Sequence, residues 1–185
     1  MKLSLFPRLD RKKSALTKIR AEKNIPAVIY GAIKNQPVFV QGAAFSALLR
    51  QIPENHLSNT IFTIEYDGSE YKALVKGIEY NKTTYEVLHL DFMIPKDKPV
   101  NVKIPIVCNG VIDCVGIKLG GSLRRLIRSF PVQCTMENIP SFLEVDVREM
   151  QVGDAKRLRD IALPPEVRPL LNLNEVAVTI AKQRS

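Results

Sequence analysis

The side chains best suited to do chemistry in this chain are the basic ones gathered near its N-terminus. Residues 1–23 hold eight Lys or Arg and two acids, a net charge of +6 in a chain whose total formal charge is +8. Lys and Arg neutralise phosphates and release their counterions, so the cluster favours a polyanion, most often nucleic acid and less often an anionic membrane surface. The alternative is a terminus that only keeps the chain in solution. The bases are Lys2, Arg8, Arg11, Lys12, Lys13, Lys18, Arg20 and Lys23.

Three other polar residues can add recognition to this charge. Tyr30 precedes Gly31, which lets another backbone approach closely, so the tyrosine ring and hydroxyl can be presented to a ribose or a base. Tyr30 alone would more often be an ordinary sheet residue. His89 and Asp91 are two positions apart on an expected strand, so they share one face while apolar neighbours take the other. This pair can read 2′-hydroxyls and base edges, or it can be a simple solvated surface.

Catalysis and metal binding require patterns that this sequence lacks. A hydrolase needs a nucleophile or a metal with oriented partners, and no G-x-S-x-G, H-E-x-x-H or Walker motif occurs. Cys108, Cys114 and Cys134 form no C-x-x-C pair, whereas zinc needs four donors, usually in two close pairs. We therefore expect no enzymatic activity, no cofactor and no metal, and we expect reduced cysteines.

The composition predicts a globular, soluble protein. Hydrophobic residues make up 45% of the chain, enough to bury ordinary cores. The apolar stretch 3–6 is too short for the core of a signal peptide, and nowhere do 18 apolar residues run together. We expect a cytoplasmic protein without membrane contact.

The first half of the chain is expected to be mainly strands. Alternating and β-branched residues predict strands at Ile25–Tyr30, Gln36–Gln41, Thr60–Tyr66, Glu70–Glu79 and Tyr85–Phe92. Asp67-Gly68 predicts a hairpin turn between the third and the fourth. One helix is expected within residues 11–23, with Ser14 as its N-terminal cap, and another from about Ala43 to Gln51. In the first helix, Leu16 and Ile19 would face inward and Lys18 and Arg20 outward.

A second β-rich section is expected after a proline-stiffened linker at residues 95–99. Its strands are predicted at Val100–Val107, Pro131–Met136, Phe142–Val147 and Asn174–Ala181. Arg124, Arg125 and Arg128 form a second basic group. The sequence thus predicts a mainly β (α+β) chain with one domain at 1–94 and another at 100–185.

Short motifs along nearly the whole chain resemble one known family. Arg20, Ile25-Pro-Ala-Val-Ile-Tyr-Gly31, Phe39-Val with Phe45, and His89-x-Asp91-Phe92 resemble the 5S-rRNA-binding bacterial large-ribosomal-subunit protein twenty-five family. Val102-x-Ile-Pro-Ile106, Gly116-Ile-Lys-Leu-Gly-Gly-Ser-Leu123, Asn138-Ile-Pro-x-Phe-Leu-Glu-Val-Asp146, Gly153-Asp and Leu163-Pro-Pro resemble the extra domain of its long form, the general stress protein CTC.

The resemblance implies an N-terminal β-barrel-like domain that binds the loop E region of 5S rRNA, followed by a β-rich C-terminal domain. It implies a structural ribosomal protein of the central protuberance, with rRNA and large-subunit proteins as partners, monomeric when free. The matching positions for RNA contacts are Arg8, Lys13, Arg20, Tyr30, Lys72, Lys76, His89 and Asp91. The chain departs from the family at Ala21, where Arg is common, at Lys23, often Gly, and after Ile78, where His-Pro is frequent.

Two alternatives stay open at this point. The first is a stress-induced RNA chaperone that binds many RNAs through charge alone, and the second is an RNA-processing enzyme that uses His89. Asp91 argues against the chaperone, because a carboxylate on a basic face repels phosphate. Its presence makes sense if it accepts a hydrogen bond from a guanine amino group or a ribose hydroxyl, or if it orients His89.

Overall fold

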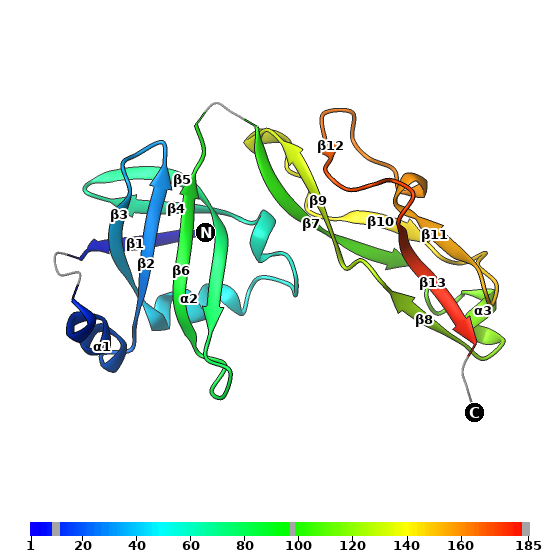
Figure 1. Cartoon of the computed structure of the whole chain (residues 1–185), viewed down its shortest axis with the longest axis horizontal. Coiled ribbons are helices and arrows are strands. Elements are labelled where there is room, and N and C mark those ends of the chain that lie inside the picture. The colour runs from blue at the N-terminus through cyan, green and yellow to red at the C-terminus, as the bar shows by residue number, and fades with distance from the viewer. Residues whose placement is uncertain (9–11, 97–98, 183–185) are drawn as a thin grey trace. The chain divides into compact units, whose positions relative to one another are not determined.

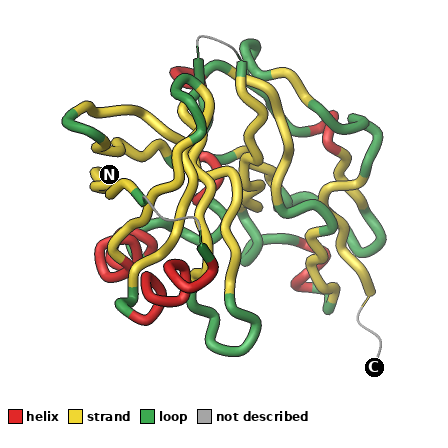
Figure 2. The backbone as a smooth tube through the Cα atoms, turned by 60° about the vertical axis from the view of Figure 1, so that its left-hand side comes forward, coloured by secondary structure: helices red, strands yellow, loops and turns green. Residues whose placement is uncertain are grey.

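The computed structural model describes residues 1–8, 12–96 and 99–182. The chain divides into two units, Met1–Lys98 and Pro99–Ser185, and each is described by itself. Both consist mainly of strands, and the described residues include the short α-helices α1 (Lys13–Ala21), α2 (Gly42–Leu49) and α3 (Val115–Lys118) (Figure 1; Figure 2). The predicted fold class, mainly β with short helices, is confirmed.

The first unit is a closed barrel of six strands. They are β1 (Lys2–Pro7), β2 (Asn24–Gly31), β3 (Gln36–Gln41), β4 (Ile61–Tyr66), β5 (Ser69–Tyr80) and β6 (Val87–Ile94). Their order around the barrel is β1-β3-β2-β6-β5-β4. β1 pairs with β4, and β2 with β6, in parallel, while the remaining neighbours are antiparallel.

Alternating apolar side chains fill this barrel. Phe62, Ile64, Leu90 and Phe92 are completely buried, and the rings of Phe62 and Phe92 pack edge to face with their centroids 6.3 Å apart. Successive residues of a strand point to opposite sides, so the residues between these face outward. Burial of the core therefore decides which side chains each strand presents on the outer surface.

Local sequence explains one turn of the barrel but not its first strand. Asp67 and Gly68 both have positive φ, 52° and 72°, as a two-residue type I′ turn requires, so the predicted hairpin is confirmed. β1 was not predicted, because its few apolar residues carry little periodic signal. Leu3 and Leu5 are buried, and the strand closes the barrel by pairing with both β3 and β4.

Helix α1 has the predicted sidedness but not the predicted start. Leu16 and Ile19 are half-buried, whereas Lys18 and Arg20 are exposed. Ser14 lies inside the helix and is not its cap; residue 12 occupies that position, without a side-chain hydrogen bond. The part of the prediction that concerned Arg11 lies outside the described residues.

The second unit contains two sheets. Its strands are β7 (Val100–Asn109), β8 (Gly121–Arg125), β9 (Ser129–Cys134), β10 (Leu143–Asp146), β11 (Ala155–Arg157), β12 (Arg168–Pro169) and β13 (Val176–Lys182). One sheet has the order β10-β7-β9-β12 and the other β11-β13-β8. Ile104, Phe130, Val132 and Ile180 are completely buried in this unit. Short 3-10 turns occur at Leu57–Asn59 in the barrel and at Met136–Asn138 and Leu158–Asp160 here.

Two glycines of the second unit allow backbones to approach each other. A Cβ atom added at Gly116 would lie 2.9 Å from the carbonyl oxygen of Met150, and one at Gly121 would lie 2.6 Å from the carbonyl oxygen of Gly116.

Arg124 and Arg125 are consecutive in β8, so their side chains leave opposite sides of the strand. They therefore do not form one basic face.

The linker, the cysteines and the expected absence of membrane helices and metal sites remain to be compared with the structure. Residues 97–98 of the expected linker lie outside the described residues. Cys114 and Cys134 are buried and Cys108 is half-buried. Within the described residues, no helix is long and apolar enough to cross a membrane, and no cluster of three or more His, Cys, Asp or Glu could hold a metal ion.

The separate cores lead to a paired prediction. Phe92→Ala should lower the free energy of unfolding of the barrel by about 3–5 kcal/mol and leave the second unit unchanged, because the lost ring leaves a cavity in one core only. Phe130→Ala is the matched control and should do the reverse. Denaturant unfolding followed by hydrogen exchange would separate the units. If either substitution destabilised both units equally, they would form one cooperative core.

Candidate nucleic-acid interface

The outward faces of β2 and β6 bring the predicted recognition residues together. The two strands run in parallel with Val28 opposite Asp91 and Tyr30 opposite Met93. Ile29, Leu90 and Phe92 point into the barrel, where they are fully buried, so the residues between them lie outside. Tyr30, His89 and Asp91 are all half-buried on this outer side. The expectation that His89 and Asp91 share one face is confirmed.

His89 and Asp91 form a direct contact. Nδ1 of His89 lies 3.1 Å from Oδ1 of Asp91, and their side chains are 25% and 44% exposed. A carboxylate can only accept, so the imidazole Nδ1–H donates to Asp91. In the neutral ring this leaves Nε2 as an acceptor.

Gly77 of the neighbouring strand β5 makes room for this carboxylate. Gly77 pairs with Asp91 across the β5–β6 ladder, directly after an irregularity in register between Val75 and Gly77. A Cβ atom at Gly77 would lie 2.5 Å from Oδ2 of Asp91 and 3.2 Å from its Cγ. The carboxylate therefore lies over the glycine, close to the sheet surface.

Tyr30 lies close enough to Asp91 for the carboxylate charge to affect the Tyr30 hydroxyl. Burial raises the pKa of the Tyr30 hydroxyl, and the negative charge of Asp91 raises it further. The hydroxyl therefore keeps its proton and can act as a donor on the same outer face as His89 and Asp91. Gly31 follows with φ of 112°, and a Cβ there would collide with the carbonyl oxygen of Ile94. The expected close approach of a backbone at Gly31 is confirmed.

Arg8 follows the end of β1 and lies on the other side of β3 from the β2–β6 face. Its backbone N–H donates to the carbonyl of Pro37 at 3.0 Å, and Pro37 pairs with Val28, which pairs with Asp91. At about 4.8 Å per strand, the backbones of Arg8 and Asp91 are roughly 14 Å apart along the barrel wall, half of the way around its six strands. Nε of Arg8 is buried and has no hydrogen-bond partner within the described residues.

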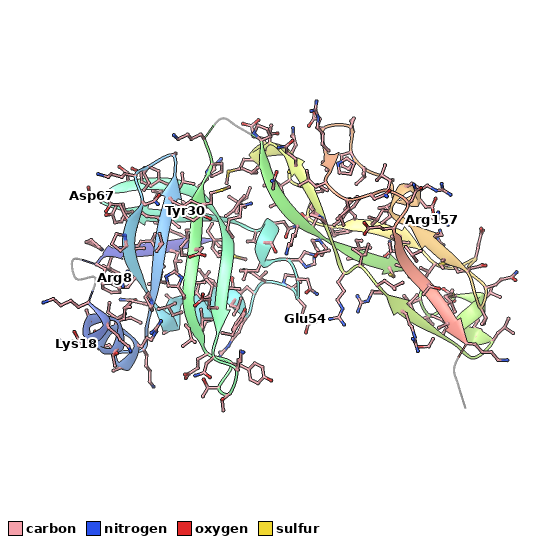
Figure 3. The ribbon with its side chains drawn as sticks, viewed as in Figure 1. Arg8, Lys18, Tyr30, Glu54, Asp67 and Arg157 are labelled. Carbon is pink, nitrogen blue, oxygen red and sulfur yellow. The ribbon has the colours of Figure 1, made fainter. Side chains whose placement is uncertain are left out.

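Helix α1 contributes the remaining bases. Nη2 of Arg20 donates to the carbonyl oxygen of Leu88 at 3.2 Å, which fixes the guanidinium beside the start of β6, one residue before His89. Lys13 and Lys18 are exposed on the helix, and Figure 3 shows Arg8 and Lys18 on the same side of the unit. Lys13 and Lys18 can thus contribute long-range charge.

Lys72 and Lys76 have different positions on β5. Lys76 is exposed at the register irregularity beside Gly77 and so lies next to Asp91. Lys72 is exposed but pairs with Thr63 of β4, farther from β2. The structure thus places Lys76 with the central residues and Lys72 at the margin.

Lys2 does not belong to the N-terminal basic cluster. Its Nζ lies 3.3 Å from Glu65 and 2.8 Å from Glu70, and these hydrogen bonds raise the pKa of the amine. The charge of Lys2 is therefore matched locally. Sequence alone could not show this, because both acids come from the β4–β5 hairpin.

An aromatic pair beside Arg8 was missed by the sequence interpretation. The rings of Phe6 and Phe39 stack with centroids 5.3 Å apart and an interplanar angle of 23°. Phe6 is 37% exposed, so part of this stack is open to a partner. Phe39 belongs to a family motif, but its partner lies on the strand that was not predicted.

Comparison with known proteins supports one family over the full length of the chain. Residues 3–92 match the model of the Ribosomal L25p family, and residues 99–184 match the model described as ribosomal protein TL5, C-terminal domain. A protein named large ribosomal subunit protein bL25 from Chlamydia abortus is 44% identical over 185 residues, which cover 99% of this chain and 100% of the relative.

The proteins of the same name from Chlamydia trachomatis serovar D and Chlamydia pneumoniae are 44% and 42% identical over the same shares of both chains. These relatives are ribosomal proteins rather than enzymes. The two matched segments follow each other in this chain as the barrel and the second β-rich unit. The chain therefore belongs to the Ribosomal L25p family, in the long form that carries a C-terminal domain.

Proposed function

We propose that this chain is a structural protein of the large ribosomal subunit that binds 5S rRNA at its loop E region, within the central protuberance. The names of the full-length relatives support the ribosomal role and, with it, a place in the cytoplasm. The RNA-binding surface would be the outer face of β2 and β6 together with α1. Further partners would be neighbouring rRNA and large-subunit proteins, and the free protein would be a monomer.

The observation that carries this proposal is the contact of His89 with Asp91 beside Tyr30. Asp91 offers carboxylate acceptors, His89 offers Nε2 when neutral, and Tyr30 offers a hydroxyl donor. Acceptors of this kind select N–H and O–H donors, such as a guanine amino group or a ribose 2′-hydroxyl, and they reject phosphate. This arrangement suits a minor groove or an irregular internal loop of RNA, where such groups are accessible.

The surrounding bases supply affinity without sequence information. Lys and Arg on α1, together with Arg8, can neutralise phosphates of the same RNA, which fixes the RNA in position. The acceptor group then distinguishes one RNA surface from another. A protein that bound RNA only through charge would gain nothing from a carboxylate at the centre of its binding face.

Competition binding tests the proposal directly. Labelled 5S rRNA bound to the full-length protein should be displaced by unlabelled 5S rRNA, but poorly by tRNA or by 5S rRNA without loop E. The measurement is a gel shift at a fixed, stated salt concentration. Equal competition by all three RNAs would instead support a general RNA chaperone.

Arg20→Ala should weaken binding to every RNA tested. If Arg20 contacts one phosphate, the slope of log affinity against log salt should become shallower by about one unit. Lys18→Ala is the matched control, because it removes an exposed charge from the same helix. Since only Arg20 is held against β6, the loss for Lys18→Ala should be smaller, and equal losses would rule out a special position for Arg20.

Asp91→Ala should have opposite effects on specific and unspecific binding. Its affinity for 5S rRNA should fall by roughly 1–3 kcal/mol, as expected when a polar group loses its partner. Affinity for unrelated RNA should stay level or rise, because a negative charge has been removed. Asp67→Asn, at the tip of the β4–β5 hairpin, controls for charge alone. Stronger binding of Asp91→Ala to all RNAs, 5S rRNA included, would show that Asp91 is an ordinary surface acid.

A further inference from the structure

A hollow opens in the barrel where the pairing of β2 and β6 ends. The parallel ladder begins at Ala27 and Leu90, and the residues before these positions are not paired with each other. The hollow has a volume of about 500 Å³, within the range of sites for small molecules. Its walls come from the end of α1, from α2 and from the β5–β6 turn, which lie at the lower end of the first unit in Figure 1.

The lining combines cations with aromatic rings. Arg20 and Lys23 lie on one wall, and Tyr80 and Tyr85 on another, where these tyrosines are 44% and 79% exposed. The acid in the lining, Glu86, has its carboxylate oxygen 3.2 Å from the hydroxyl of Thr84. Cationic groups next to accessible aromatic faces are what a nucleotide requires, since its phosphate needs the charge and its base stacks on the ring.

Backbone strain is concentrated at the same place. The described non-glycine residues with positive φ are Lys23 at 58°, Asn55 at 65°, Asp67 at 52° and Tyr85 at 57°. Asn and Asp adopt this conformation readily, whereas Lys and Tyr seldom do. Both unusual residues line the hollow, one on each side. Strained backbone conformations of this kind persist only where the surrounding structure holds them, and they cluster at binding sites.

The turn that carries Tyr85 is held by its own hydrogen bonds. The backbone N–H of Tyr85 donates to the carbonyl of Asn81 at 2.9 Å, and the side-chain oxygen of Asn81 accepts from the N–H of Thr83 at 2.9 Å. The ring is therefore presented on an ordered turn. Because the turn is ordered before binding, less backbone entropy is lost when a base stacks on the ring.

The hollow is continuous with the proposed RNA-binding face. Arg20 lines the hollow and donates to the carbonyl of Leu88, and the next residue is His89. An RNA that contacts His89 can therefore also reach the hollow.

We propose that the hollow receives one unstacked nucleotide of the bound RNA, with its base against the ring of Tyr85 and its phosphate at Lys23 and Arg20. This inference rests on the proposed RNA-binding function and adds a site that holds an extruded base rather than contacting the surface of a helix. Continuity with the face of His89 and the accessible rings of Tyr80 and Tyr85 favour a nucleotide over an acidic peptide, which the test below distinguishes.

The test uses the full-length protein and 5S rRNA. Tyr85→Leu should weaken binding by about 10-fold, because it removes the stacking ring but keeps an apolar side chain. Tyr85→Phe should bind like the unaltered protein. The bases of the bound 5S rRNA are then probed by chemical modification. The unaltered protein and Tyr85→Phe should change the reactivity of one nucleotide that lies in the hollow. Tyr85→Leu should lose this one change and keep the rest of the footprint.

Lys23→Gly separates this role from a purely structural one. Glycine removes the strain at the left-handed position, so the thermal unfolding midpoint should rise, while affinity for 5S rRNA should fall more than for Lys18→Ala. Wild-type affinity and footprint for Tyr85→Leu would overturn the inference. The inference would also be overturned if Tyr85→Leu bound 5S rRNA normally but failed to assemble into large subunits. The hollow would then bind a protein. If tRNA displaced 5S rRNA from the unaltered protein equally well, the proposed function itself would fail.

Discussion

The register between β2 and β6 is the constraint on which the binding face depends. It is set by the core, because Ile29, Leu90 and Phe92 must all point into the barrel. Side chains alternate along a strand, so a slip of one residue would turn the whole outer set inward. With the core in place, Tyr30 and Asp91 both have to lie on the outer face. The hydrophobic effect thus determines the geometry of a polar surface that it does not itself contact.

The same face combines two interactions with opposite preferences. Lysines and arginines on α1 attract any polyanion, while Asp91 repels phosphate and accepts only from N–H or O–H groups. The carboxylate is accommodated because position 77 is glycine and because His89 donates to it. A surface built in this way gives up part of its unspecific affinity and gains discrimination, since a wrong RNA leaves a carboxylate without a donor.

Local sequence features predicted local structure well, and non-local pairing accounts for what they missed. The shared face of His89 and Asp91 follows from the two-residue period, and the Asp67-Gly68 turn follows from its need for positive φ. By contrast, the placement of Tyr30 and Asp91 on one outer face depends on a parallel pairing of distant segments. β1 and the ion pairs of Lys2 with Glu65 and Glu70 likewise arise only when the barrel closes. The hollow was missed for the same reason, since its walls come from three separate segments.

Lys23 shows how binding and stability can compete at one residue. It follows α1 in the left-handed conformation, a position at which glycine is usual after a helix. Its carbonyl accepts from the N–H of Gly42 at 3.1 Å, so the backbone conformation is held by α2 as well as by the helix it ends. Glycine would meet that requirement with less strain, but it would bring no charge to the wall opposite Tyr85. If the hollow holds a phosphate, a lysine at this position contributes the positive charge. Its binding role then explains why the chain keeps a residue that lowers the stability of the folded state.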